Sequence, residues 1–219
     1  MSVKAVERIL AEKIIVVMRG VPDEQLIPCA EAMLEGGIRI MEVAFSASGK
    51  TEDVQTARAI FSLREHFGDK ICVGAGTVLN PDQVRLTREA GGQFVISPDS
   101  DPGIISLTKQ AGLTSVPGAL TPTEIMSAHR HGADFVKLFP ASALGIPYIK
   151  AVLTPLDHIR LLAVGGIKPE NIDDYISCGV KGFGISSGIL DPEDVKSRNY
   201  GKITENARKY TSVAKEYNN

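Results

Sequence analysis

The segment Asp134-Phe-Val-Lys-Leu-Phe-Pro140 is a short apolar run that carries one lysine, Lys137, in its second half. A run of this kind is typical of a strand buried in a parallel sheet. Lysine is seldom fully buried, and a buried amine has a lowered pKa that suits a nucleophile. The alternative, which position alone favours, is a lysine that ends the strand with its stem along apolar surface and its ammonium in water.

Apolar runs of the same kind recur along the whole chain, and segments with helical periodicity separate them. Each run is short enough to be a strand, and each segment between two runs is long enough to hold a helix. The predicted strands are Ile14–Met18, Ile38–Phe45, Ile71–Gly74, Phe94–Ser97, Thr114–Val116, Phe135–Phe139, Arg160–Val164 and Gly182–Ile185.

Helix boundaries are marked between these runs. A capping side chain precedes a proline suited to the first helical turn at Asn80-Pro81, Thr121-Pro122 and Asp191-Pro192, and Thr121 with Glu124 has the spacing of a capping box. Glycines that end helices stand shortly before the next run. These glycines are Gly36-Gly37, Gly91-Gly92, Gly112, Gly132 and Gly179.

A strict alternation of strand and helix requires a parallel sheet, which is either open or closed as a barrel. Eight units in 219 residues favour a single-domain α/β fold over residues 1–219, the (β/α)8 or TIM barrel. An open Rossmann sheet is the alternative, suggested by Gly74-Ala-Gly-Thr-Val-Leu79. That segment lacks the third glycine of the dinucleotide fingerprint, and no acid ends the next strand. A short helix over Met1–Lys13 and a last helix with a frayed end over Lys196–Asn219 are also predicted.

The composition is that of an ordinary folded domain, with 43% hydrophobic and 23% charged residues. A net charge of -2 with interspersed signs, together with few aromatic residues, argues against nucleic-acid and anionic-membrane partners. Cys29, Cys72 and Cys178 lie far apart without Cys-x-x-Cys spacing, so we predict neither disulfides nor a zinc site, and a cytoplasmic location fits. The sequence has no signal-peptide pattern and no apolar run long enough to span a membrane.

The active site of a barrel enzyme lies at the carboxyl ends of its strands and in the loops that follow them. A lysine amine there can condense with a ketone, a carboxylate can move protons at the adjacent carbon, and glycine amides after the last two strands can bind phosphate. The residues predicted at these positions are Arg19, Glu42, Gly74–Thr77, Ser97-Pro98, Pro117-Gly118, Lys137–Pro140, Gly165-Gly166 and Ser186–Gly188.

Other candidate groups are less suited to this site. His66, His129, His131 and His158 fall in helices or before strands, away from the carboxyl ends, so no catalytic role is predicted for them. No cluster of His, Asp and Glu has the spacing of a metal site, and we therefore predict neither a metal nor a cofactor.

At these positions the sequence resembles the class I aldolases that cleave 2-keto-3-deoxy-6-phosphogluconate (KDPG). It also resembles their relatives that act on the galactonate epimer (KDPGal) and on 4-hydroxy-2-oxoglutarate (KHG). The similar segments occur in the same order and span nearly the whole chain. They are Met41-Glu-Val43, Val73-Gly-Ala-Gly-Thr-Val-Leu-Asn80, Ile96-Ser-Pro98, Val116-Pro-Gly118, Val136-Lys-Leu-Phe-Pro-Ala141 and Val164-Gly-Gly-Ile167.

The resemblance implies roles for individual residues. Lys137 corresponds to the Schiff-base lysine and Glu42 to the general acid/base. Thr77 corresponds to a residue that holds the pyruvate carboxylate, and Pro98 and Phe139 correspond to residues that line the pocket. Gly165 and Gly166 correspond to the phosphate loop, while Ser186-Ser187-Gly188 stands where the gluconate enzymes have Gly-Gly-Ser. The resemblance also implies a keto acid phosphate substrate and a homotrimer.

One departure from the gluconate enzymes concerns the substrate carboxylate. Those enzymes have an arginine four residues after the acid, where this chain has Ser46. Serine cannot form the bidentate clamp that arginine makes on a carboxylate, so we expect Arg19, at the end of the first strand, to replace it. The galactonate enzymes look similar at both positions, and the choice of epimer, like activity on KHG, stays open.

Two other functions are compatible with the residues. A sugar-phosphate isomerase or epimerase on this barrel would use Glu42 as a base and the same phosphate loop, but would not need an imine-forming lysine. A non-catalytic binding protein would leave Lys137 to titrate like a free lysine.

Overall fold

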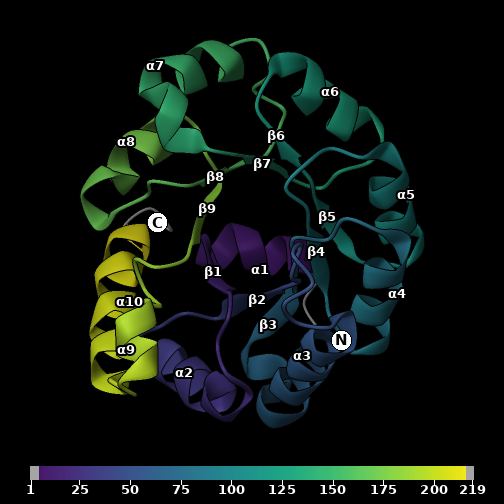
Figure 1. The fold of residues 1–219 in the computed structure, drawn as a ribbon. Helices are drawn as coiled ribbons and strands as arrows, with labels where there is room; N and C mark the ends of the chain where they lie inside the picture. The colour runs from purple at the N-terminus through teal and green to yellow at the C-terminus, as the bar shows by residue number, and fades with distance from the viewer. Residues whose placement is uncertain (1–4, 216–219) are drawn as a thin grey trace.

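Nine parallel strands form one sheet in residues 5–215, which are the part of the chain that the computed structural model describes (Figure 1). Their order in the sheet is β5-β4-β3-β2-β1-β9-β8-β7-β6. All eight predicted strands are present; three have the predicted bounds, and the ends of the others are shifted by at most two residues. The strands are β1 (Ile14–Met18), β2 (Ile40–Ala44), β3 (Cys72–Gly76), β4 (Phe94–Ile96), β5 (Thr114–Val116), β6 (Gly118–Ala119), β7 (Val136–Leu138), β8 (Leu161–Val164) and β9 (Gly182–Ile185).

The ninth strand arises because Pro117 divides one barrel position into β5 and β6. Proline has no N–H to give to the ladder, so the strand is interrupted there. β5 pairs with β4 on one side and β6 pairs with β7 on the other. The Lys137 N–H donates to the Pro117 carbonyl oxygen at 2.8 Å, which continues the ladder past the break. The two ends of the strand order therefore meet, and the sheet closes as the predicted (β/α)8 barrel.

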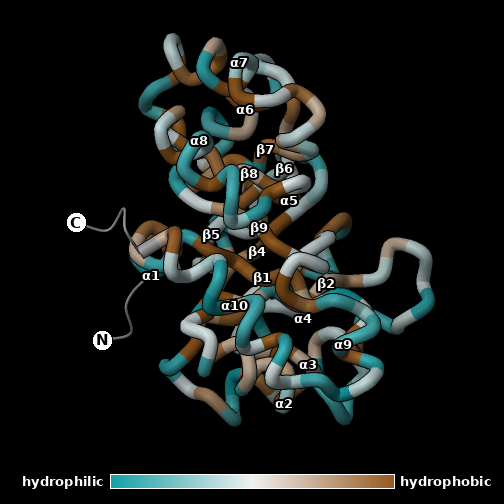
Figure 2. The backbone as a smooth tube through the Cα atoms, turned by 90° about the vertical axis from the view of Figure 1, so that its left-hand side faces the viewer, coloured by the Kyte–Doolittle hydropathy of each residue, from teal (hydrophilic) through white to brown (hydrophobic). Residues whose placement is uncertain are grey.

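Helices surround the strands (Figure 1), and Figure 2 shows hydrophobic residues along the strands with hydrophilic residues toward the periphery. No helix among residues 5–215 combines the length and the apolar character needed to cross a membrane. Both predicted terminal helices are present, while their outermost residues, 1–4 and 216–219, lie outside the described part. The helices are α1 (Ala5–Glu12), α2 (Asp23–Glu35), α3 (Asp53–Phe67), η1 (Gly68–Lys70), α4 (Pro81–Glu89), α5 (Pro102–Gln110), α6 (Pro122–Arg130), α7 (Ala141–Leu153), η2 (Pro169–Asn171), α8 (Ile172–Ser177), α9 (Pro192–Lys196) and α10 (Tyr200–Lys215).

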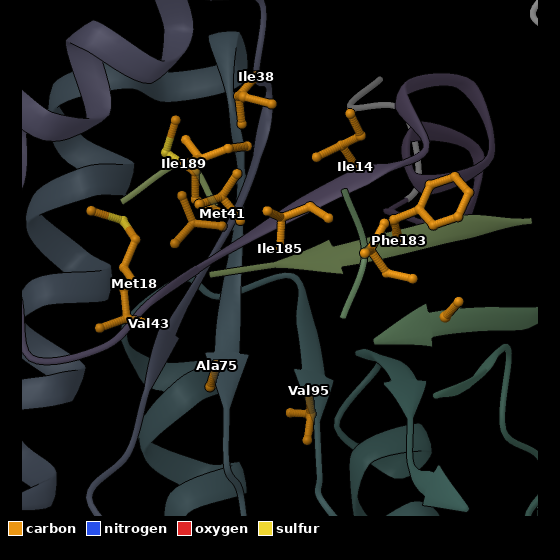
Figure 3. Close-up of a cluster of buried hydrophobic side chains, with 14 of the residues drawn as sticks. Ile14, Met18, Ile38, Met41, Val43, Ala75, Val95, Phe183, Ile185 and Ile189 are labelled. Atoms are coloured by element: carbon orange, nitrogen blue, oxygen red, sulfur yellow. The ribbon is translucent and has the colours of Figure 1, made fainter. Parts of the chain in front are cut away.

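Side chains alternate between the two faces of the strands, as the two-residue period of a strand requires. One buried cluster lies between strands and helices, and it includes Met41 and Val43 of β2 (Figure 3). A second buried cluster contains Ile40 of β2 and Phe135 before β7, together with Ile9 of α1. α1 projects inside the ring of strands in Figure 1 and lies to one side of the strands in Figure 2, so it covers one end of the barrel, and the second cluster fills the barrel interior above it.

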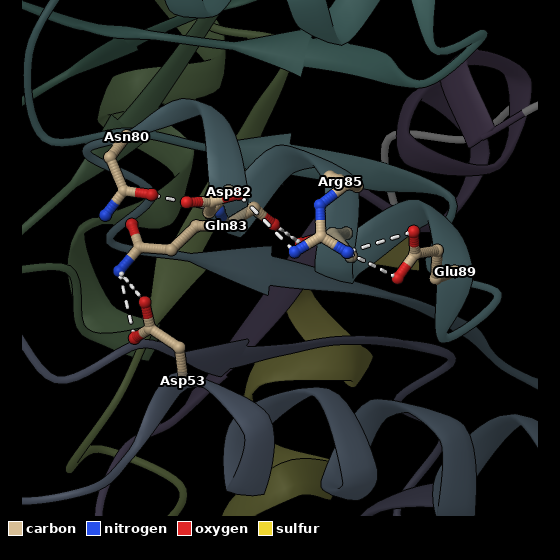
Figure 4. A network of polar contacts seen from close by, with 7 residues as sticks. Asp53, Asn80, Asp82, Gln83, Arg85 and Glu89 are labelled. Carbon is tan, nitrogen blue, oxygen red and sulfur yellow. Dashed lines mark hydrogen bonds and ion pairs between the residues drawn. The ribbon is translucent and has the colours of Figure 1, made fainter.

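The loop between β3 and α4 is held by the predicted cap at the start of α4. The Asn80 Oδ1 accepts a hydrogen bond from the Gln83 N–H at 3.0 Å, and the Gln83 side chain accepts one from the Leu79 N–H at 2.7 Å. The Gln83 amide also donates to both carboxylate oxygens of Asp53 at 3.1 Å, which joins α4 to α3 (Figure 4). The predicted caps at Thr121 and Asp191 are present as well.

The last helix completes the ring by packing on α2. The Thr204 hydroxyl donates to the Ala32 carbonyl at 3.0 Å, and the Thr211 hydroxyl donates to the Gly36 carbonyl at 2.8 Å. These bonds span more than 170 residues of sequence and hold α10 beside the first βα unit. The position of α10 matters because its Tyr210 reaches the loops after β8 and β9.

Candidate active site

A cavity of about 530 Å³ opens where the strands end at their carboxyl side. Of the positions predicted at the rim, Gly74–Gly76, Ser97, Pro117-Gly118, Leu138 and Pro140 do not line it. The ten residues predicted to react with or bind the substrate all line it, although they come from seven of the eight barrel positions. They are Arg19, Glu42, Thr77, Pro98, Lys137, Phe139, Gly165, Gly166, Ser186 and Ser187. Parallel strands that enter one barrel end at one rim, which brings these distant positions together.

Lys137 points into the barrel because it lies two residues after the inward-facing Phe135. Directly beneath it is an apolar layer that includes Ile15, Val116 and Leu162. This desolvation lowers the pKa of the Lys137 amine, the negative charge of Glu42 opposes that shift, and the nearby Arg19 adds to it. A larger fraction of the amine is therefore neutral near pH 7 than for a free lysine side chain.

Glu42 lies on β2, in register with Val17 of β1 and Gly74 of β3. Its side chain is almost fully buried, with 3% of the residue exposed. Burial raises the pKa of the carboxyl group, and the positive charges of Lys137 and Arg19 partly offset that rise. A side chain at Gly76 would collide with Glu42 Oε1, so this glycine of the Gly-Ala-Gly-Thr run gives the carboxylate its space.

Arg19 and Thr77 form one polar wall of the cavity. The Arg19 Nη2 donates to the Thr77 Oγ1 at 2.8 Å, and Arg19 forms no ion pair within residues 5–215. Thr77 has a φ of 56°, in the left-handed region that non-glycine residues seldom occupy. Ser46 does not line the cavity. Its hydroxyl accepts a hydrogen bond from the Lys50 N–H at 3.1 Å and forms another with the Ser48 hydroxyl at 3.3 Å, within its own loop.

The loops after β8 and β9 form another wall. Gly166 has a φ of 75°, and a side chain there would also collide with Ser142. The backbone N–H groups of Gly166 and Ser187 donate no hydrogen bond within the described residues. Backbone N–H groups that are free to donate are a common feature of anion sites in proteins, so this wall can bind an anion.

Two polar residues that line the cavity, Lys168 and Tyr210, were not predicted. Lys168 lies two residues after Gly166, and a lysine so close to the predicted phosphate loop could have been predicted from the sequence to line the cavity. Tyr210 comes from α10, and its buried hydroxyl donates to the Ile167 carbonyl at 3.2 Å. The hydroxyl also lies against Gly188, where a side chain would collide with it. No local pattern distinguishes Tyr210 from any other buried residue of an amphipathic helix.

Phe139 lines the cavity with 43% of its surface exposed, so it is a residue of the cavity mouth and not of the core. Its ring centroid is 4.9 Å from the Lys137 Nζ. None of the four histidines lines the cavity. Within residues 5–215, no group of three or more His, Cys, Asp and Glu side chains is arranged to hold a metal ion.

The fold and the site define a (β/α)8-barrel enzyme with an interior lysine and carboxylate. A family model for the KDPG and KHG aldolases matches residues 6–206, and the chain belongs to this family. It is therefore an aldolase, a carbon–carbon lyase.

Curated relatives include enzymes for both sugar epimers. The chain is 33% identical over 177 residues to the 2-dehydro-3-deoxy-6-phosphogalactonate aldolase of Escherichia coli (strain K12), a match that covers 80% of this chain and 83% of the relative. It is 32% identical over 194 residues to the KHG/KDPG aldolase of the same organism, covering 88% of this chain and 87% of the relative.

Solved structures of the family have the same barrel. A native KDPGal structure superposes with a TM-score of 0.83 at 29% identity, covering 93% of this chain and 94% of the other. The KDPG aldolase of Legionella pneumophila, with pyruvate captured as a covalent carbinolamine intermediate, gives a TM-score of 0.84 at 28% identity, covering 95% and 98%. A porous protein cage made by fusing symmetric oligomeric domains gives 0.83 at 30% identity, covering 93% and 72%.

The electrostatics of the site predict how Lys137 titrates. Competitive labelling of lysines as a function of pH should give Lys137 a pKa below the value of about 10.4 for a free lysine side chain. Glu42→Gln should lower that pKa further, because it removes the negative charge that favours the ammonium form while burial still favours the amine. A pKa of Lys137 that rises or does not move in Glu42→Gln would contradict this account of the site.

Proposed function

We propose that this aldolase forms an imine on Lys137 and reversibly cleaves a 2-keto-3-deoxy-6-phospho-sugar acid to pyruvate and glyceraldehyde 3-phosphate. The substrate belongs to the gluconate or the galactonate series, with KHG as a further candidate that would yield pyruvate and glyoxylate. The observation that carries the proposal is the desolvated Lys137 amine in one cavity with the buried Glu42. The carbinolamine in the Legionella pneumophila relative supports it.

The proposed chemistry begins with attack of the neutral Lys137 amine on the C2 ketone of the substrate. The resulting carbinolamine accepts a proton on its hydroxyl from Glu42, directly or through water, and loses water to give an iminium ion, which leaves Glu42 as a carboxylate. Glu42 accepts the C4 hydroxyl proton, directly or through water, the C3–C4 bond breaks, and its electron pair moves toward the iminium nitrogen. This step releases the aldehyde and leaves an enamine on Lys137. Glu42 then returns the proton to C3, and hydrolysis of the pyruvate imine frees Lys137.

The two polar walls suit the two ends of such a substrate. Arg19 and Thr77 can hold the carboxylate next to the reacting ketone. The free N–H groups after β8 and β9 can hold the phosphate at the other end. A barrel isomerase would use a similar phosphate wall but has no use for the Lys137 amine, and membership of the aldolase family does not favour it.

The first prediction tests the imine. Incubation with pyruvate and borohydride should add one reduced pyruvyl group per chain, and peptide mapping should locate it on Lys137, because reduction traps the imine. Lys137→Met should keep the circular dichroism spectrum and lose turnover. Modification at another lysine, or no modification, would contradict the proposed mechanism.

Glu42→Gln is the matched control for this experiment. It keeps the amine, so pyruvate should still be trapped on Lys137. Exchange of the pyruvate methyl protons with solvent should fall by about 10²-fold or more, which is the usual contribution of a general acid/base. Unchanged exchange would mean that another group moves the proton.

The carboxylate clamp gives a separate prediction. Arg19→Ala should weaken pyruvate binding by roughly 10- to 100-fold, or about 1.5 to 3 kcal/mol, the range for a hydrogen bond to a charged group. Arg19→Lys should fall between wild type and Arg19→Ala, since lysine keeps the charge but not the fork of donors. Normal pyruvate binding in Arg19→Ala would assign the carboxylate to Thr77 and backbone amides instead.

We also propose that the protein assembles as a homotrimer, as its family resemblance implies. The related domain in the protein cage is a symmetric oligomer, and four exposed apolar side chains lie on or beside consecutive helices α3, α4 and α5. They are Val54, Phe61, Leu79 and Leu107. Exposed apolar patches of this kind mark interfaces.

Sedimentation equilibrium tests the assembly. The mass should be three times the chain mass of 23.5 kDa, and Phe61→Glu should reduce it because a charge would have to be buried at the interface. Lys196→Glu, on the distant α9, serves as the control and should sediment as wild type. A monomeric wild-type protein would rule the trimer out.

A further inference from the structure

Lys168 adds a cation to the wall formed by the loops after β8 and β9. Among residues 5–215, three cationic side chains line the cavity, Arg19, Lys137 and Lys168, and Glu42 is the acid that lines it with them. Arg19 bonds Thr77, and Lys137 lies in β7 within reach of the Glu42 charge. Lys168 is exposed and forms no ion pair within residues 5–215. Its ammonium is therefore free to meet an anion.

The backbone that carries Lys168 is held from two sides. The Lys168 N–H donates to the Asn171 Oδ1 at 2.9 Å, and the Asn171 amide donates to the Gly166 carbonyl at 3.0 Å. From α10, the Tyr210 hydroxyl donates to the Ile167 carbonyl at 3.2 Å. These three bonds fix the segment from Gly166 to Lys168, so the lysine stem starts from a defined point at the cavity rim.

The other groups of this wall do not provide a full positive charge to balance the negative charge of a bound phosphate. A phosphate monoester carries a charge of about -1.5 to -2 at pH 7. Free N–H groups at Gly166 and Ser187 offer hydrogen bonds but only partial positive charge, and Ser186 and Ser187 offer neutral hydroxyls. A lysine ammonium acts as a compact point charge on phosphate and is a common partner for it.

We propose that Lys168 binds the phosphate of the substrate and makes the enzyme select phosphorylated over unphosphorylated keto acids. This inference rests on the function proposed above, because it assigns the phosphate end of the same site. Arg19 serves the carboxylate at the other end of the substrate, and Lys168 leaves the chemistry at Lys137 untouched.

The test compares Lys168→Gln with Lys181→Gln, a control at an exposed lysine that precedes β9 at the opposite end of the barrel. The measured quantity is the ratio of kcat/KM for the 6-phosphorylated 2-keto-3-deoxy sugar acid to that for its unphosphorylated form. Lys168→Gln should lower this ratio by about tenfold or more through KM for the phosphorylated substrate, the size expected for one charged hydrogen bond. Lys168→Arg should restore most of it, and Lys181→Gln should match wild type. Inorganic phosphate should also inhibit Lys168→Gln less strongly.

An unchanged ratio in Lys168→Gln, or an equal loss in Lys181→Gln, would overturn the role of Lys168. Borohydride trapping of pyruvate on Lys137 in the wild-type protein distinguishes a wrong assignment of Lys168 from a wrong proposed function. If pyruvate is trapped and the ratio does not change, the assignment of Lys168 alone is wrong. If pyruvate is not trapped on wild-type Lys137, the proposed function fails together with this inference.

Discussion

Burial of the Lys137 amine above an apolar layer is the constraint on which the rest of the site depends. The two-residue period of β7 turns Lys137 inward with Phe135, and closure of the sheet places Ile15, Val116 and Leu162 beneath it. Desolvation lowers the pKa of the amine. The charge of Glu42 opposes this effect, while burial raises the pKa of Glu42 and the charges of Lys137 and Arg19 oppose that rise. Both pKa shifts are directed toward neutral pH, which is the direction that favours proton transfer there.

Closure of the barrel explains why so much of the site could be predicted from sequence. Apolar runs, proline-marked caps and helix-ending glycines predicted eight βα units, and a parallel barrel brings the carboxyl ends of its strands to one rim. Residues as distant as Arg19 and Ser187 could therefore be assigned to one cavity without any knowledge of contacts. The family resemblance then predicted which of these residues react and which only line the wall.

The features that sequence reasoning missed depend on contacts between distant segments or on single backbone atoms. Pro117 divides β5 from β6 because it lacks an N–H. The sequence predicts Thr114–Val116 as a complete strand and Pro117 as the first residue of the loop after it. Tyr210 reaches Ile167 across 43 residues, and its position follows from the packing of α10 on α2. The sequence alone does not show that a side chain at Gly76 would collide with Glu42, because a glycine at this position is equally typical of a tight turn.

Lys137 and Glu42 lie on strands, whereas the groups available to bind the ends of the substrate lie in loops or at strand ends, and this separation explains how members of one family can differ in substrate. Lys137 and Glu42 lie on strands whose outward-facing neighbours pack against the helices, so their positions are fixed by the core. The groups available for the ends of the substrate lie in loops or at strand ends, where a change of residue does not disturb the core. Ser46 bonds within its own loop while Arg19 faces the cavity, so the carboxylate cation can come from β1 instead of from the segment after β2. The proposed reacting pair, Lys137 and Glu42, can therefore stay constant while the binding groups change around it.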